Sequence, residues 1–297
     1  MEFLYFLESM RSSVLNVFFI ICTSFGEELV LMSLFAVIYW CINKTLAYRI
    51  AFSYFLSGVA VQGLKVHFRI ERPWVIDPDF KPVGSALDTA TGYSFPSGHT
   101  QSSTSLYSSI ALHFKKKALY ILSFAVIALV MFSRMYLGCH TPKDVLVSFA
   151  ITFIISLVVS LVYDNLNSSL LTDLIVMLFT LLLSAGLFVY SYQLVAAGST
   201  TDVLAMDGFK AAGAGMGFGI GWFIEKRFIR FTPKNSRFGI QVLKLVLGLG
   251  VTVALKAGLK LLLGDTMLTN TLRYFLILLW VVAIFPLIIK KFLKDRI

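Results

Sequence analysis

Long apolar stretches separated by short polar connections follow one another along most of the 297-residue chain. A helix needs about 20 apolar residues to cross the hydrocarbon core of a bilayer, where its backbone polar groups must be paired within the segment. The pattern therefore predicts an all-α protein, a polytopic transmembrane helical bundle with about nine spans at residues 29–42, 46–66, 99–114, 118–137, 144–163, 172–194, 211–224, 240–263 and 271–289.

The N-terminal region does not fit this pattern as clearly. Residues 12–24 are apolar but short, and they end at Gly26-Glu27-Glu28. This length is compatible with an interfacial or re-entrant helix or with a tenth span, and the sequence leaves the choice open. Residues 1–11 contain Glu2 and Glu8 and lack a basic start, so we expect no cleavable signal peptide.

Composition agrees with a membrane protein. Hydrophobic residues make up 58% of the chain and charged residues 14%, whereas soluble domains carry roughly a quarter charged residues. A soluble globular protein is excluded. The net charge of +10 would suggest nucleic acid in a soluble protein, but here we expect cytoplasmic loops and no nucleic-acid partner. The three cysteines are scattered and lack the paired spacings of a zinc or disulfide framework.

Basic residues gather on alternate connections between the predicted spans. By the positive-inside rule, the connections that hold this set face the cytoplasm: Lys44, Arg49, Lys115, Lys116, Lys117, Lys226, Arg227, Arg230, Lys234, Arg237, Lys290, Lys291, Lys294 and Arg296. The connections at 65–99 and 134–144 then lie on the outer side of the membrane.

Three polar clusters occupy these two outer connections. They read Lys65-x6-Arg72-Pro73, Pro96-Ser97-Gly98-His99 and Ser133-Arg134-x5-His140-x3-Asp144. Any one of them occurs by chance, but three in order at one membrane face are specific. In this order and spacing they resemble the tripartite signature of the phosphatidic acid phosphatase type 2 superfamily, which contains membrane lipid phosphate phosphatases. The resemblance covers about the first half of the chain.

The residue types in these clusters suit phosphoryl transfer, and this argument does not depend on the family resemblance. A phosphoryl group in transfer carries negative charge on three equatorial oxygens, and catalysis is mostly positioning and preorganised positive charge. Lys65, Arg72 and Arg134 supply that charge. Ser97 and Gly98 precede a predicted helix, so their backbone N–H groups add donors at its positive end. We expect this phosphate site to work with no metal and no cofactor.

Two histidines and one carboxylate complete the chemistry. His140 and Asp144 stand four residues apart, so Asp144 can accept a hydrogen bond from the Nδ1–H group. Nε2 then keeps a free lone pair for attack on phosphorus. His99 can protonate the leaving oxygen and then activate water. The resemblance implies the same roles: a phosphohistidine on His140, oriented by Asp144, with His99 as the acid. His67 and His113 lie outside the three clusters and are expected to be structural.

These observations predict an integral membrane phosphatase that removes a terminal phosphate from a lipid. Resemblance to bacterial members favours undecaprenyl pyrophosphate, with phosphatidylglycerol phosphate or phosphatidic acid next. It also favours the plasma membrane of a bacterium, and the positive-inside rule predicts that the active site faces outward. A lipid phosphotransferase with the same intermediate and a lipid transporter or flippase are the alternatives. We expect lipid substrate and membrane lipids as partners, while the oligomeric state is open.

The polar connection at 164–171 divides the chain into two predicted parts. Residues 1–163 are expected to form the catalytic lipid phosphatase domain, and residues 164–297 to add transmembrane helices of unknown role. In the second part, Lys256 and Lys260 lie four residues apart, with Asp265 and Arg273 nearby. We expect these lysines to extend toward the membrane surface, and contact with a second phosphate or an anionic lipid is the alternative.

Overall fold

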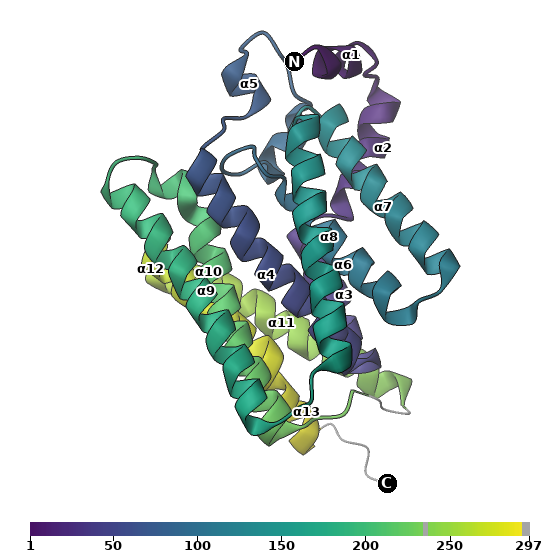
Figure 1. Cartoon of the computed structure of the whole chain (residues 1–297), viewed down its shortest axis with the longest axis vertical. Helices are drawn as coiled ribbons and strands as arrows, with labels where there is room; N and C mark the ends of the chain where they lie inside the picture. The colour runs from purple at the N-terminus through teal and green to yellow at the C-terminus, as the bar shows by residue number, and fades with distance from the viewer. Residues whose placement is uncertain (234–236, 293–297) are drawn as a thin grey trace.

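The computed structural model describes residues 1–233 and 237–292, and within these ranges the chain forms helices and no strand (Figure 1). The first half contains α1 (Glu2–Ser9), α2 (Ser13–Ser24), α3 (Glu28–Val37), α4 (Lys44–Phe68), α5 (Pro73–Ile76), α6 (Gly98–Phe114), α7 (Lys117–Tyr136) and α8 (Pro142–Asn165). The second half contains α9 (Leu170–Ala196), α10 (Asp202–Ile224), α11 (Phe238–Leu263), α12 (Met267–Leu279) and α13 (Phe285–Phe292). Single π-helical turns follow α3, α10 and α12, at Ile38–Ile42, Glu225–Ile229 and Trp280–Ile284.

Polar residues start the long helices where the apolar stretches are interrupted. Each accepts a hydrogen bond from a backbone N–H in the first helical turn, which satisfies a donor that the helix itself cannot pair. Five such caps are Asn43 before α4, Ser97 before α6, Thr141 before α8, Ser169 before α9 and Thr201 before α10. Two of these caps, Ser97 and Thr141, begin the helices that carry His99 and Asp144.

Helices occupy all nine ranges predicted from the apolar pattern, but nine transmembrane spans are not confirmed. Among the described residues, five helical segments are long and apolar enough to cross a membrane: α7, α8, α9, α11 and the run Met267–Phe292. A sixth is added if α2 and Glu28–Ile42, bent by 46° to each other, form one span. Helix α6 has 17 residues and buries many serine and threonine side chains, so its polar surface lies against other helices.

The N-terminal segment forms two helices instead of one. Helix α2 packs along α7, and its bend with α3 fits a broken span or a re-entrant loop, so both options from the sequence stay open. Helix α1, which the sequence pattern did not predict, buries Leu4 and Leu7 and also contacts α7. The hydroxyl of Tyr5 donates to Asp77, which ties α1 to the long loop after α4.

The two halves of the chain pack on each other through α4 and α10. Phe52 and Phe55 of α4 lie against Phe218 of α10, with ring centroids 4.9 and 4.7 Å apart, and Phe52 also contacts Trp222. These rings belong to one hydrophobic cluster that includes residues of both halves. The division into parts 1–163 and 164–297 stays a prediction.

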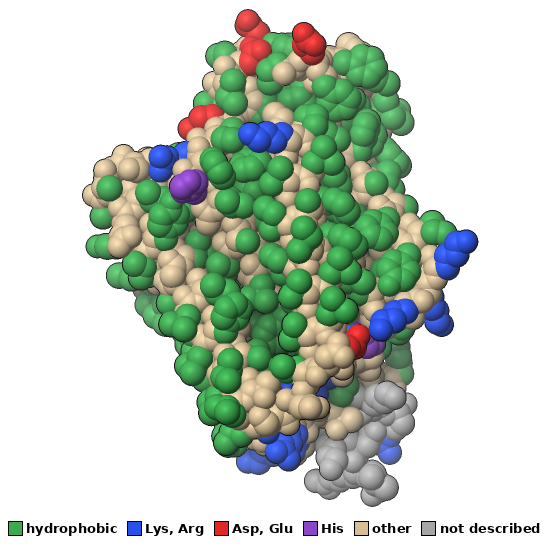
Figure 2. Space-filling view, viewed as in Figure 1, with side chains coloured by type: hydrophobic (Ala, Val, Ile, Leu, Met, Phe, Trp, Pro, Cys, Tyr) green, Lys and Arg blue, Asp and Glu red, His purple; other side chains and the backbone are tan. Residues whose placement is uncertain are grey.

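Charged side chains on the visible face lie mainly toward its two ends. Figure 2 shows hydrophobic side chains over most of the middle, carboxylates at the upper end with Lys and Arg groups just below them, and further Lys and Arg groups at the right-hand edge and the lower end. This distribution suits a protein whose middle lies in lipid. Of the basic residues used for the positive-inside argument, Lys234, Lys294 and Arg296 lie outside the described residues. The assignment of sides stays a prediction.

Candidate active site

Lys65 lies in the last turn of α4, and Arg69, the residue that follows the helix, has a left-handed conformation. The side chain is 5% exposed, and its Nζ donates to the carbonyl of Tyr93 at 2.5 Å. That contact joins the end of α4 to the segment just before α6. A lysine ammonium carries three donors, so two more can point to a ligand.

Arg72 precedes α5, where Pro73 starts the helix without a backbone N–H. Its guanidinium is buried and donates to three backbone carbonyls, those of Thr91 at 2.6 Å, Gly92 at 3.1 Å and Cys139 at 3.0 Å. Nη1 also lies 3.0 Å from Nε2 of His140. The long loop and the α7–α8 connection therefore hold this arginine in one orientation beside the histidine.

Ser97, Gly98 and His99 begin α6. The hydroxyl of Ser97 accepts from the N–H of Thr100 at 3.4 Å, and the Ser97 N–H donates to the carbonyl of Asp144 at 3.1 Å. The Ser97 N–H is thus already engaged. Gly98 lines the cavity described below, and a Cβ built on it would meet nothing within 4 Å, so its backbone is open to a ligand.

His99 follows on the same turn and also lines the cavity. Its Nε2 is buried and has no hydrogen-bond partner among the described residues. The loop between α2 and α3 packs closely here, because a Cβ on Gly26 would lie 2.7 Å from the carbonyl oxygen of His99. A side chain at position 26 would displace the start of α6, which explains the glycine.

Arg134 lies in the last turn of α7 and is fully buried. Its Nη1 donates to the hydroxyls of Thr23 at 3.1 Å and Thr89 at 3.4 Å. Nε and Nη2 are buried with no hydrogen-bond partner among the described residues. Buried donors are normally satisfied, so these two N–H groups are available for an anion.

His140 and Asp144 meet across the start of α8. Thr141 and Asp144 form a capping box in which Oδ2 of Asp144 accepts from the Thr141 N–H at 2.8 Å. The same Oδ2 lies 3.5 Å from Nδ1 of His140 and accepts from the hydroxyl of Ser94 at 2.6 Å. Ser94 Oγ is itself 3.5 Å from Nδ1. Ser94 and Asp144 thus both face the same ring nitrogen.

These contacts determine the tautomer of His140. A guanidinium has donors only, so Nε2 beside Arg72 must be the accepting nitrogen. The ring proton of the neutral imidazole is then on Nδ1, which faces Asp144 and Ser94. The attack by Nε2 that the sequence suggests is compatible with this arrangement and stays a prediction.

The surroundings keep His140 neutral and Arg72 charged. Burial, and then the positive charges of the three nearby Lys and Arg side chains, hold the pKa of His140 well below its ordinary value of 6.5. Burial, and then the charge of Arg134, lower the pKa of Arg72 to about 10. Near neutral pH the site therefore contains a neutral imidazole beside a guanidinium that remains protonated.

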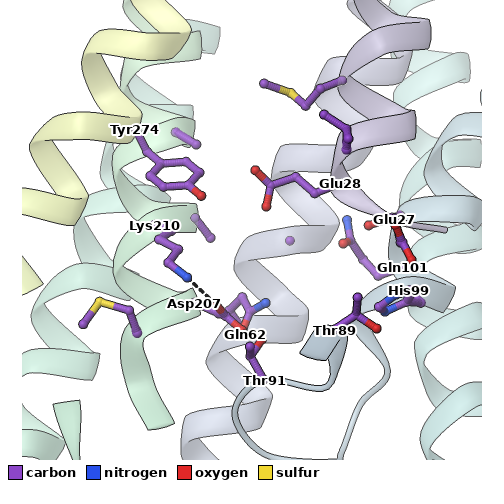
Figure 3. A pocket seen from close by; sticks show the side chains of 18 of the residues that line it. Glu27, Glu28, Gln62, Thr89, Thr91, His99, Gln101, Asp207, Lys210 and Tyr274 are labelled. Carbon is purple, nitrogen blue, oxygen red and sulfur yellow. Dashed lines mark hydrogen bonds and ion pairs between the residues drawn. The ribbon is translucent and has the colours of Figure 1, made fainter. Parts of the chain in front are cut away.

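The site opens into a cavity of about 580 Å³. Five predicted site residues line it: Lys65, Arg72, Gly98, His99 and His140. Ser97, Arg134 and Asp144 do not line it, and all three are buried. Helices α10, α11 and α12 form the opposite wall, and Figure 3 shows Lys210 and Tyr274 there, across from His99. The second half of the chain therefore shares the cavity with the predicted site.

Several residues in this arrangement were not found from the sequence. They are Thr23, Thr89, Thr91, Tyr93, Ser94 and Asp207. Of these residues, only Ser94 lies close to a motif in the sequence, two positions before Pro96 of the second cluster. Asp207 comes from α10 and accepts from the hydroxyl of Thr91 at 2.6 Å (Figure 3). No spacing in the sequence connects those two residues.

The remaining histidines do not line the cavity. Nδ1 of His67 lies 2.7 Å from the Tyr190 hydroxyl, and Nε2 of His113 lies 3.3 Å from the Asn43 amide. Across residues 1–233 and 237–292, no group of three or more His, Cys, Asp or Glu side chains is arranged to hold a metal ion.

Comparison with known proteins gives two family matches. Residues 46–168 match the PAP2 superfamily, and residues 209–295 match the family described as PAP2 superfamily phosphatase, transmembrane extension. Phosphatidylglycerophosphatase B of Bacillus subtilis (strain 168) is 34% identical over 94 residues, which cover 28% of this chain and 44% of that protein. The match thus spans less than half the length of this curated relative. No solved structure matches the chain.

The two family matches agree with the positions of the predicted features. The first includes Lys65, His99 and Asp144, and the second includes α11 and α12 on the opposite wall of the cavity. Together they cover more than half of the chain. The protein is thus a membrane protein that belongs to the PAP2 superfamily, the phosphatidic acid phosphatase type 2 superfamily that its three motifs resemble.

Proposed function

We propose that this protein is a lipid phosphate phosphatase that works through a phosphohistidine on His140. The observation that carries the proposal is the contact of Arg72 Nη1 with Nε2 of His140, at the edge of a cavity shared with Lys65 and His99. Because the imidazole nitrogen of His140 and the guanidinium of Arg72 are in contact, a phosphate bound by the arginine would lie beside the nitrogen that attacks it.

The first step transfers the phosphoryl group to the enzyme. Lys65, Arg72, Arg134 and the Gly98 N–H bind the three non-bridging oxygens, and Ser97 supports them by capping α6. Nε2 of His140 attacks phosphorus and forms the N–P bond as the P–O bond to the lipid breaks. His99 gives its proton to the leaving oxygen. The Nδ1 proton stays with His140, stabilised by Asp144.

The second step hydrolyses the intermediate. Neutral His99 takes a proton from water, whose oxygen attacks phosphorus as the N–P bond breaks. Inorganic phosphate leaves, and Nε2 of His140 regains its lone pair. Lys65, Arg72 and Arg134 supply the positive charge that binds the phosphoryl oxygens in this scheme, so we propose that the reaction needs no metal and no cofactor. The two-step route matches the roles that the family resemblance implies.

The substrate is proposed to be a membrane lipid with a terminal phosphate. Undecaprenyl pyrophosphate is the first candidate from the sequence, and phosphatidylglycerol phosphate or phosphatidic acid comes next. The printed name of the Bacillus relative adds support for phosphatidylglycerol phosphate. We further propose a bacterial plasma membrane as the location, with the cavity open to the outer side as the positive-inside rule predicts.

Phosphate release by detergent-purified protein with EDTA present tests the proposal. The substrates are undecaprenyl pyrophosphate, phosphatidylglycerol phosphate, phosphatidic acid and a sphingoid phosphate, and His140→Ala is the negative control. We expect release that EDTA does not reduce and that the variant lacks. Release that requires an added lipid or sugar acceptor would identify a phosphotransferase. No release by folded protein would favour a transporter or flippase.

A further inference from the structure

The cavity extends well beyond the predicted catalytic cluster. Its volume of about 580 Å³ is far more than one phosphate group needs, and it suits a whole lipid headgroup. Four of the six Lys and Arg side chains that line it come from the second half of the chain: Lys210, Lys256, Lys260 and Arg273. The catalytic steps proposed above use none of these four.

Arg273 is the buried member of this group. It lies on α12 with 4% of its surface exposed. Nη2 faces Asp265 at 3.4 Å and also donates to Asn270. Nε and Nη1 are buried and have no hydrogen-bond partner among the described residues. Arg134 of the predicted site also has two buried nitrogens without a partner in the described part of the chain, but of these two arginines only Arg273 lines the cavity, so its free N–H groups are open to an anion there.

The lysines on the same wall as Arg273 form ion pairs with only a few carboxylates. Lys260 lies 3.1 Å from Asp265, which it shares with Arg273. Lys256 lies 3.6 Å from Glu28, and Lys210 lies 3.0 Å from Asp207. These four cations thus have three carboxylate partners, and the other carboxylates in the cavity lining are Glu27 and Asp88. The second-half wall keeps an excess of positive charge.

Tyr274 and Asp265 hold the basic side chains of this wall in position. Lys256 Nζ and the Arg273 guanidinium lie 5.9 and 5.8 Å from the centre of the Tyr274 ring. Asp265 stays ionised, because its hydrogen bonds with Asn270 and then Lys260 lower its pKa to about 2. Figure 3 places Tyr274 and Lys210 on the wall opposite His99. Lys210 also pairs with Asp207, which accepts from Thr91, so it lies at the side of this wall nearest to the predicted site.

We propose that Arg273, Lys256, Lys260 and Lys210 form a second anion subsite that binds the internal phosphodiester of a glycerophospholipid substrate while its terminal phosphate meets His140. The proposal rests on the proposed function and assigns a role to the second half of the chain. An arginine guanidinium can donate two parallel hydrogen bonds to two phosphate oxygens, and the lysine ammonium groups attract the same negative charge. A lipid with one phosphate would leave this subsite empty.

Two substrates with matched acyl chains test the subsite. Phosphatidylglycerol phosphate carries both a terminal phosphate and a phosphodiester, and phosphatidic acid carries a single phosphate. The variants are Lys256→Gln/Lys260→Gln, at exposed positions that should not disturb folding, together with Arg273→Gln and Arg273→Lys. Lys291→Gln on α13, which does not line the cavity, is the control.

The subsite predicts a substrate-specific effect. We expect the double variant and Arg273→Gln to raise KM for phosphatidylglycerol phosphate at least about tenfold, with kcat little changed and KM for phosphatidic acid within about twofold. Arg273→Lys should give an intermediate KM, because it keeps the charge and loses the fork. Equal changes with both lipids, or no change, would overturn the subsite while wild-type activity upholds the proposed function.

A binding measurement keeps the subsite testable if no lipid is hydrolysed. Fluorescent phosphatidylglycerol, which has the phosphodiester and no terminal phosphate, is titrated in neutral detergent micelles against wild-type protein and the double variant. We expect an anisotropy change that the double variant weakens at least about fivefold and Lys291→Gln leaves intact. Equal binding by all three proteins would refute the subsite. Weakened binding with unchanged KM values would also refute it, since the site would then hold a separate anionic lipid.

Discussion

Nη1 of Arg72 lies 3.0 Å from Nε2 of His140, so the guanidinium expected to hold the phosphate touches the nitrogen expected to attack it. The same guanidinium also donates to three backbone carbonyls, which hold it in place. A phosphate oxygen that replaces Nε2 as the acceptor would exchange a bond to a neutral nitrogen for a stronger bond between two charged groups. The substrate would thus find Nε2 already oriented toward phosphorus.

Replacement of the nucleophile should abolish turnover. His140→Ala is expected to lower kcat by at least about a thousandfold on every substrate, because no other described side chain presents a lone pair at that position. Rapid acid-free quenching of wild-type protein with radiolabelled lipid should trap a phosphoenzyme that acid destroys and alkali preserves. A phosphoenzyme that still forms in His140→Ala protein would show that another residue is the nucleophile.

Ser94 should contribute through Asp144 and not through substrate binding. Its hydroxyl donates to Oδ2 of Asp144 at 2.6 Å, so Ser94→Ala removes one partner of the carboxylate that faces His140. We expect kcat to fall about tenfold, which corresponds to one hydrogen bond, with KM little changed. Ser94→Thr, which keeps the hydroxyl, should restore part of the activity. A change in KM alone would contradict this role.

The pH profile should reflect the lowered pKa of His140. The neutral imidazole is the reactive form, and burial with nearby positive charge disfavours the protonated form. The acid limb of kcat/KM is therefore expected below pH 6.5. Because the folded pKa lies below the unfolded one, the contribution of His140 to stability is full above pH 6.5 and is lost as pH falls toward the folded-state pKa. An acid limb above pH 7 would contradict the assignment.

His99 should matter more for a monoester than for a pyrophosphate. A monoester expels an alkoxide that needs a proton, whereas a pyrophosphate expels a phosphate that leaves more easily. His99→Ala is expected to reduce kcat on phosphatidic acid at least about tenfold more than on undecaprenyl pyrophosphate. Equal losses on the two lipids would remove the role of His99 as the acid.

Asp207 should connect the second half of the chain to the catalytic arginine. It accepts from the Thr91 hydroxyl, and the Thr91 carbonyl accepts from Arg72 Nη2, each at 2.6 Å. Asp207→Asn and Thr91→Val should each lower kcat/KM about threefold to tenfold. The double variant should lose little more than either single variant, because both act on one contact. Fully additive losses would show that the residues act independently.

The positions of the long helices and of the three motifs could be predicted from local sequence, whereas the short helices α1 and α5 could not. Apolar runs of membrane-spanning length leave few options besides helices, and Lys65, Arg72, His99, Arg134, His140 and Asp144 stand at recognisable spacings beside those runs. The number of spans was less predictable. Helices such as α6 carry polar side chains that only neighbouring helices can cover, so hydropathy alone does not describe them.

The partners of the motif residues depend on contacts between distant parts of the chain. Arg72 and His140 are separated by 68 positions, and Thr91 and Asp207 by 116, so no helical or local period relates them. The packing of α10 on α4 brings the second half to the cavity. Spacing along a chain determines which residues share a helix face, whereas the fit of side chains between helices determines which faces meet. The residues of the proposed chemistry could therefore be named from the sequence, whereas the cavity wall formed by α10, α11 and α12 emerged only from the packing.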